Sequence, residues 1–148
     1  MKPLEHWVTT SQGIEVPTSE HAYQAAKFEQ PNVHRLIANA RSDSEHKPAY
    51  ADGVVAKERA GVFAEKGFMR PDFEIAKRSI MLAIVTMKFH RNPELAELLL
   101  ATDDEQIVEG NNWGDRFWGV DPIGSMNGQN NLGNILMLVR NNLRKKSL

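Results

Sequence analysis

Polar and apolar side chains recur at helical spacing over residues 18–28, the most informative pattern in the chain. Thr18 or Ser19 begins this stretch, and the hydroxyl of either one can accept a hydrogen bond from a first-turn N–H group, as an N-cap does. Polar residues then return at steps of three, four and seven positions, at Glu20, Tyr23, Gln24 and Lys27. Such steps place these side chains on one side of a helix. A stripe of this kind is a solvated face or the wall of a cleft, and the pattern alone favours the solvated face.

Five further helices are predicted from apolar residues that stand three and four positions apart. They cover about 33–40, 49–60, 71–90, 93–100 and 132–143. Gly53 interrupts the second of these helices, and a connector over 61–70 leads from it to the third, which is the longest. Pro71 suits a helix start, where its missing N–H costs nothing.

Short strands are predicted at two places. Trp7–Thr10 and Ile14–Val16 flank the turn residues Ser11-Gln12-Gly13, which indicates a small hairpin. Gln106–Glu109 is a further strand candidate that would fit with this hairpin. The pattern therefore predicts a mostly α fold with a few short β-strands.

Composition excludes several classes of protein. The chain has 148 residues, which suits a single domain over 1–148 with one core. A net charge of −1 gives no global attraction to nucleic acid or membrane, and the absence of cysteine excludes disulfides and thiolate chemistry. No apolar run approaches the roughly 20 residues that span a bilayer. With no signal-peptide pattern, we expect a cytoplasmic protein. The histidines lack metal-ligand spacing, so no metal and no cofactor are expected.

Three separated motifs resemble those of the NADAR superfamily of YbiA-like proteins. The first is Pro-Thr-Ser-Glu-His-x-Tyr-Gln-Ala-x-Lys-Phe at 17–28, the second Asp-x-x-Trp-Gly at 115–119, and the third Gly-x-Asn-x-Leu-Gly at 128–133. They occur in the family's order, and the resemblance runs from about Leu4 to Leu143. It implies a single-domain YbiA-like fold.

The resemblance also implies an enzyme, because NADAR members act on N-glycosidic bonds of ribose in nucleotide-like substrates. We favour a hydrolase that removes ADP-ribose from guanine bases, with a nucleotide-like small molecule or ADP-ribosylated nucleic acid as its partner. Two alternatives are an N-glycosidase of the phosphoribosylamino-pyrimidine intermediates of riboflavin synthesis and a non-catalytic module that binds ADP-ribose or NAD.

Three residues are catalytic candidates. Glu20 is the candidate carboxylate, because a carboxylate stabilises an oxocarbenium-like state or activates water. Lys27 matches a family lysine linked to Schiff-base chemistry and would act covalently or electrostatically. Asp115 is the candidate second acid. The alternatives are a salt bridge for Lys27 and, for Asp115, hydrogen bonds that orient the Trp-Gly loop.

Ten residues are candidates for substrate binding. They are Thr18, His21, Tyr23, Gln24, Phe73, Trp118, Gly119, Gly128, Asn130 and Gly133. Aromatic residues among them would stack on a base or belong to the core, and His21 favours capping or packing over a phosphate contact. The loop 128–133 has the form that presents N–H groups to phosphate, although by itself it favours a turn with Asn130 as N-cap.

Overall fold

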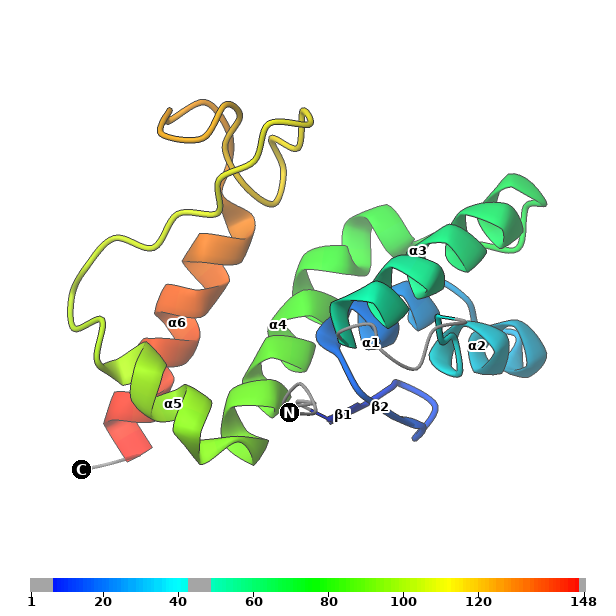
Figure 1. Cartoon of the computed structure of the whole chain (residues 1–148), viewed down its shortest axis with the longest axis horizontal. Coiled ribbons are helices and arrows are strands. Elements are labelled where there is room, and N and C mark those ends of the chain that lie inside the picture. Colours follow the sequence, from blue (N-terminus) through cyan, green and yellow to red (C-terminus); the bar gives the residue numbers. More distant parts are fainter. Residues whose placement is uncertain (1–6, 43–48, 147–148) are drawn as a thin grey trace. The chain divides into compact units, whose positions relative to one another are not determined.

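The computed structural model describes residues 7–42 and 49–146, and within this part it contains six helices and two short strands (Figure 1). The mostly α fold class is therefore confirmed. Contacts group the chain into two compact units, Met1–Arg91 and Asn92–Leu148, which are described separately below. The predicted single domain over 1–148 stays a prediction. The start of the family resemblance, Leu4–His6, lies outside the described residues.

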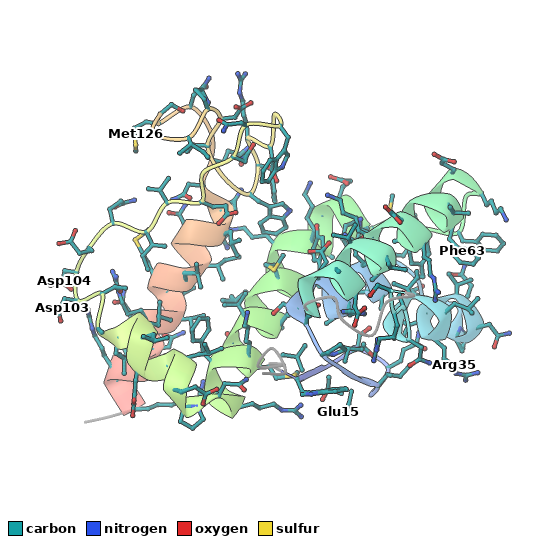
Figure 2. The ribbon with its side chains drawn as sticks, viewed as in Figure 1. Glu15, Arg35, Phe63, Asp103, Asp104 and Met126 are labelled. Carbon is teal, nitrogen blue, oxygen red and sulfur yellow. The ribbon has the colours of Figure 1, made fainter. Side chains whose placement is uncertain are left out.

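The N-terminal unit begins with the predicted hairpin. Strands β1 (Val8–Thr9) and β2 (Glu15–Val16) pair antiparallel, with Val8 opposite Val16. Gly13 takes a φ of +82° in the turn, a conformation that glycine adopts without strain. Glu15, labelled in Figure 2, accepts hydrogen bonds from the Thr9 hydroxyl and from Arg91 at the end of α4. The hairpin is thus held to the long helix.

Helix α1 (Ser19–Ala25) is the centre of this unit, and five of its seven residues are buried. It packs against α2 (Pro31–Ala38), α3 (Ala49–Glu65), α4 (Phe73–Arg91) and both strands (Figure 1). The buried alanines and Phe28 form the packing surface expected from the sequence. A short helix surrounded on several sides gives precise positions to the side chains it carries.

Helix α3 is longer than predicted. It continues through Gly61 to Glu65, so the first half of the expected connector over 61–70 is helical. Gly61 is exposed and has no heavy atom within 4 Å of where its Cβ would stand. A single exposed glycine costs a helix about 1 kcal/mol relative to alanine, which does not end a helix of 17 residues.

The C-terminal unit consists of α5 (Pro93–Leu100), a long loop, and α6 (Asn131–Lys146). The two helices pack on each other. The start of the loop is fixed to α6 because the buried Arg140 donates hydrogen bonds to the Thr102 hydroxyl and to the Glu105 carbonyl. Arg144 also pairs with Asp104, which Figure 2 labels just after α5.

The predicted strand over Gln106–Glu109 is wrong. The side chain of Asn130 accepts a hydrogen bond from the Glu109 N–H at 2.9 Å and donates one to the Ile107 carbonyl at 2.9 Å. An isolated bridge between Gly110 and Val120 follows directly. Side-chain and loop partners thus satisfy the backbone groups that a neighbouring strand would otherwise pair. Within the described residues, no helix has the length and apolar character needed to cross a membrane.

Candidate functional site

Thr18 is the N-cap of α1. Its hydroxyl oxygen accepts a hydrogen bond from the His21 N–H at 3.3 Å, and its backbone is extended, as the cap position requires. The choice between Thr18 and Ser19 is thereby settled in favour of Thr18. Because the cap fixes where the helix begins, it also fixes the direction in which Glu20 projects in the first turn.

His21 is completely buried and has hydrogen-bond partners at both ring nitrogens. Nε2 lies 2.9 Å from the Ala40 carbonyl, so this nitrogen donates, and Nδ1 therefore accepts from the Thr18 hydroxyl at 2.8 Å. Burial lowers the pKa of His21. This arrangement agrees with the packing role; its contact with a substrate stays a prediction.

Glu20 and Gln24 form a pair along one face of α1. The Gln24 side-chain amide donates a hydrogen bond to Glu20 Oε1 at 2.7 Å, one helical turn away. Gln24 is only 3% exposed, and its own Oε1 is buried with no hydrogen-bond partner within the described part of the chain. The amide nitrogen must face the carboxylate, since the reverse orientation would bring two oxygens together. Gln24 therefore holds the Glu20 side chain in one orientation.

Lys27 lies just beyond α1 and is half-buried. Its Nζ is 5.5 Å from the ring centroid of Tyr23 and 5.5 Å from that of Phe73, and the two rings are 5.5 Å apart. Burial is the largest influence on this amine and lowers the pKa of Lys27, while the nearby Glu20 opposes the shift. The amine is thus neutral over a wider pH range than an ordinary lysine.

Charged residues of α3 and α4 act on the same amine. Lys57 and Lys77 lower the pKa of Lys27, and Glu74 raises it. Lys77 is paired with Glu74 at 2.7 Å. Lys27 therefore stands among groups of both signs, contributed by three helices.

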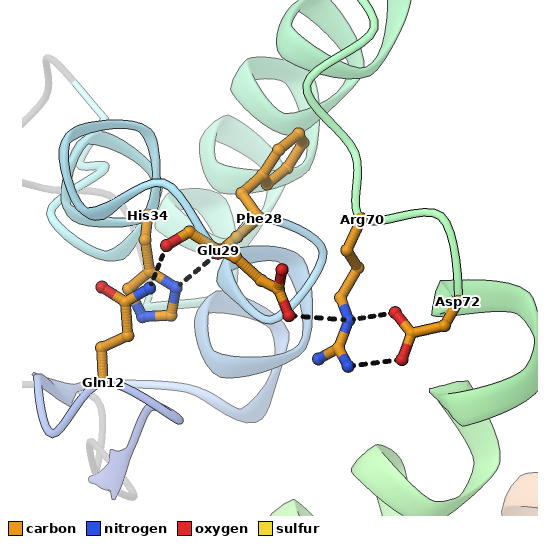
Figure 3. A network of polar contacts seen from close by, with 6 residues as sticks. All are labelled: Gln12, Phe28, Glu29, His34, Arg70 and Asp72. Carbon is orange, nitrogen blue, oxygen red and sulfur yellow. Dashed lines mark hydrogen bonds and ion pairs between the residues drawn. The ribbon is translucent and has the colours of Figure 1, made fainter.

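The backbone at residues 27–29 is held by three consecutive hydrogen bonds. The Lys27 carbonyl accepts from the Arg70 N–H at 2.8 Å. The next two carbonyls, of Phe28 and Glu29, accept from His34 Nδ1 at 3.2 Å and Gln12 Nε2 at 3.0 Å (Figure 3). The three donors come from the hairpin turn, α2 and the connector before α4. Lys27 is consequently anchored by its backbone, and these donors were not predicted from the sequence.

His34 links this anchor to the hairpin. It has no exposed surface, and its Nε2 accepts a hydrogen bond from the Thr10 hydroxyl at 2.8 Å. Arg70, which supplies another donor of the anchor, is fixed by a two-point contact with Asp72 at 2.6 and 2.7 Å (Figure 3). The residues that position Lys27 are thus themselves held in place.

Asp115 in the C-terminal unit supports its loop. Its Oδ1 accepts hydrogen bonds from the N–H groups of Phe117 at 3.1 Å and Trp118 at 2.8 Å. The buried Asn111 bonds the Asp115 backbone on both sides, accepting from its N–H and donating to its carbonyl. The structural alternative for Asp115 is therefore present, and its role as a second acid stays a prediction.

The motif glycines permit close approaches between backbones. A Cβ at Gly119 would overlap the Glu109 carbonyl, one at Gly128 the Gly119 carbonyl, and one at Gly133 the Ile107 carbonyl. Asn130, at a φ of +50°, joins the same segments through its side chain. These four residues bring the motifs at 115–119 and 128–133 together. Their contact with a nucleotide stays a prediction.

Glu109 is a candidate that sequence reasoning missed. It is half-buried, and burial followed by the nearby charge of Asp115 raises its pKa. The chain thus brings two carboxylates near each other in this loop. Its position just before the aromatic stretch 113–118 could have indicated a site residue. Glu109 was instead assigned to the predicted strand over 106–109.

The predicted site residues gather in two places. Thr18, Glu20, Tyr23, Gln24, Lys27 and Phe73 meet around α1, and Trp118 and the motif glycines join Asp115 in the C-terminal loop. The rings of Phe117 and Trp118 meet edge to face at 4.8 Å. No group of three or more metal-binding side chains occurs among residues 7–42 and 49–146.

Comparison with known proteins defines the family. The model of the NADAR domain matches residues 3–144, so the chain belongs to the NADAR domain family. The chain is 33% identical to N-glycosidase YbiA of Escherichia coli over 137 residues, which covers 93% of this chain and 76% of that protein. The NMR structure of YbiA superimposes with a TM-score of 0.71 at 30% sequence identity, covering 96% of this chain and 76% of the other. The predicted family and YbiA-like fold are confirmed.

Two further relatives bear on the activity. An N-glycosidase of Nostoc punctiforme is 33% identical over 127 residues, which is 86% of this chain and 74% of that protein. A riboflavin biosynthesis protein of Vibrio vulnificus is 33% identical over 129 residues, which is 87% of this chain but only 31% of that longer protein. At the level of the family, the predicted enzyme class, a hydrolase of N-glycosyl compounds, is confirmed by the relatives named as N-glycosidases.

Proposed function

We propose that this protein is an N-glycosidase that cleaves the bond between ribose and base in a nucleotide-like substrate. The observation that carries the proposal is the geometry of α1. Glu20 is oriented by Gln24, and its charge acts on the amine of Lys27, whose pKa is lowered by burial. A carboxylate beside an amine of lowered pKa suits the attack on a sugar that develops positive charge.

Glu20 acts on the sugar in this proposal. Cleavage of a glycosidic bond passes through an oxocarbenium-like state, and a fixed carboxylate stabilises the positive charge on the ribose. The hydrogen bond from Gln24 reduces the rotation that Glu20 would otherwise have to lose during the reaction. Removing the hydrogen bond between Gln24 and Glu20 would therefore lower kcat more than it weakens substrate binding.

Lys27 acts as the nucleophile. Its Nζ bonds to C1′ of the ribose as the bond from C1′ to the base nitrogen breaks, and the proton that the amine loses balances the one that the base gains. The C1′–O4′ bond of the ribose ring then breaks as a Schiff base forms between C1′ and Nζ, and the remaining Nζ proton passes to O4′. Water then hydrolyses the Schiff base to free sugar and the lysine amine. A lowered pKa favours this role because only the neutral amine attacks.

The remaining roles follow from the family resemblance. Asp115 assists the departing base as the second acid, and Trp118, Gly119, Gly128, Asn130 and Gly133 line the nucleotide pocket. In the N-terminal unit Tyr23 and Phe73, whose rings face the Lys27 amine, contact the sugar or base. A cytoplasmic location belongs to the same proposal.

Two substrates are candidates. The first is guanine carrying ADP-ribose, free or within nucleic acid, which is the substrate expected from the sequence. The second is a phosphoribosylamino-pyrimidine of riboflavin synthesis, which is supported by the name of the riboflavin biosynthesis protein from Vibrio vulnificus. The chain spans only 31% of that protein.

The test is product analysis by mass spectrometry after incubation with each of the two substrates. We expect release of free base and sugar from one of them, and a loss of about 100-fold or more in Glu20→Gln. Glu58→Gln is the control, since Glu58 is an exposed carboxylate on α3. Thermal stabilisation by ADP-ribose without release, and unaffected by Glu20→Gln, would instead indicate the binding module. No release and no stabilisation would contradict both.

A further inference from the structure

Gly53 is a buried glycine in the second turn of α3. An interior glycine destabilises a helix relative to alanine, so its presence calls for a local reason. A Cβ at this position would lie 3.2 Å from Glu20 Cβ, 3.4 Å from Glu20 Cγ and 3.5 Å from the Thr18 hydroxyl oxygen. Gly53 thus faces the catalytic candidate Glu20 and the N-cap of α1, Thr18.

A Cβ at position 53 would make a contact that side-chain rotation cannot relieve, because the nearest atom is the Cβ of Glu20. The Cβ of Glu20 is fixed by the α1 backbone, and no side-chain rotation moves it. The five residues that follow Glu20 in α1 are buried, so the helix itself has little room to shift. A methyl group at position 53 would therefore act on the orientation of the Glu20 side chain or on the first turn of α1.

We propose that Gly53 is a positioning residue, whose missing side chain lets α3 lie directly against Glu20 and so fixes where the Glu20 carboxylate stands. The catalytic consequence rests on the proposed function, whereas the contact does not. Gly53 acts together with Gln24, which holds the far end of the same side chain. One residue bounds Glu20 at its stem and the other at its carboxylate.

The same helix supplies a matched control. Gly61 also lies in α3, but it is exposed and no heavy atom stands within 4 Å of its Cβ position. Gly61→Ala should therefore show only the helix propensity of alanine, a rise in Tm of about 2–4 °C. Gly53→Ala gains the same propensity but adds the contact with Glu20, so we expect its Tm to fall below that of the wild type.

The readout that does not depend on activity is the NMR signal of the Gln24 side-chain NH₂ group, which reports its hydrogen bond to Glu20. We expect this signal to move in Gly53→Ala and to stay in Gly61→Ala. A Gln24 signal at its wild-type position in Gly53→Ala, with Tm raised as in Gly61→Ala, would overturn the proposal. Both the Gln24 signal and Tm can be measured whether or not the wild type cleaves either substrate. A failure of the proposal for Gly53 is therefore distinguishable from a failure of the proposed function.

Removing the Glu20 side chain provides a second arm, in case Gly53→Ala alone does not fold. In a Glu20→Gly background the opposing Cβ is gone, and Gly53→Ala should raise Tm by about the same 2–4 °C as Gly61→Ala. A fall in Tm in this background would assign the effect of Gly53 to another neighbour. Once a substrate is identified, kcat should fall about tenfold in folded Gly53→Ala with KM nearly unchanged, because a misplaced carboxylate acts on the chemical step.

Discussion

The side-chain amide of Gln24 donates a hydrogen bond to Glu20 Oε1 at 2.7 Å, and Gln24 is almost completely buried while it does so. A hydrogen bond to a charged acceptor is roughly twice as strong as one between neutral groups. Glu20 is therefore presented in a defined orientation by its own helix. This pair connects the local sequence pattern directly to the proposed chemistry.

Gln24→Leu should reduce kcat about tenfold and leave KM nearly unchanged, because Glu20 regains rotational freedom. Tm should change little, since leucine fills the same buried space and removes the unpartnered Oε1. Steady-state kinetics and thermal denaturation measure both quantities. Gln30→Ala is the control, because Gln30 is exposed and makes no capping hydrogen bond. An unchanged kcat in Gln24→Leu would remove Gln24 from the site.

Lys57→Gln should move the acidic limb of the pH–rate profile to higher pH. The groups that act on the Lys27 amine are Glu20 from α1, Lys57 from α3, and Glu74 and Lys77 from α4. Lys57 lowers the pKa of Lys27, so its removal raises that pKa and leaves less neutral amine at a given pH. The shift should shrink in high salt, because salt screens the interaction between the two charges.

The control for this charge effect is Lys66→Gln, which removes an exposed lysine that follows α3. Its profile should coincide with that of the wild type. Glu74→Gln should shift the limb in the opposite direction, because Glu74 raises the pKa of Lys27. Identical profiles for all four proteins would show that the ionisation of Lys27 does not limit the rate.

Acid should destabilise the protein through its buried histidines. Burial lowers the pKa of His21 and of His34 below the ordinary value of 6.5. Between each lowered pKa and 6.5 the unfolded chain binds more protons than the folded one, so the free energy of unfolding falls as pH falls through this window. Each histidine contributes about 1.4 kcal/mol per unit of pKa difference.

His34→Gln should make Tm less dependent on pH below 6.5, although it lowers Tm at neutral pH by removing a bond to Phe28 or Thr10. Thermal denaturation from pH 7.5 to 5 measures this. His90→Gln, at an exposed position of α4, should preserve the wild-type slope. If His34→Gln also preserves it, the acid sensitivity arises elsewhere.

Asp115→Asn separates the two roles of Asp115. The Asn side-chain oxygen can still accept from the N–H groups of Phe117 and Trp118, so Tm should stay within about 2 °C of the wild type. Because the variant cannot donate or accept a proton, kcat should fall at least about tenfold if Asp115 is the second acid. Full activity in this variant would confine Asp115 to holding the loop.

The local parts of the fold were predictable from the sequence. Thr18 caps α1 through a bond to a residue three positions away, and the polar positions Glu20 and Gln24 need only helical periodicity, although Lys27 lies beyond the end of α1. The hairpin needs only a glycine turn between two short strands. In each case the residues that decide the structure are close together in the chain.

The errors and omissions arise from distant partners. The expected strand at Gln106–Glu109 fails because Asn130, far along the chain, takes up its backbone groups. Gly53 was identified only as an interruption of its helix, since the contact that explains it comes from Glu20. Likewise the anchor of Lys27 depends on donors from three separate elements. Such contacts follow from tertiary packing, which a periodic pattern does not encode.

Reduction with borohydride during turnover tests the central claim most directly, because it converts a Schiff base into a stable adduct. With whichever substrate releases base, we predict a sugar adduct that peptide mass analysis locates on Lys27. The adduct should be absent in Lys27→Arg, which keeps the charge but lacks an amine able to attack. Undiminished turnover in Lys27→Arg, with no adduct on Lys27 in the wild type, would contradict the role proposed for this residue.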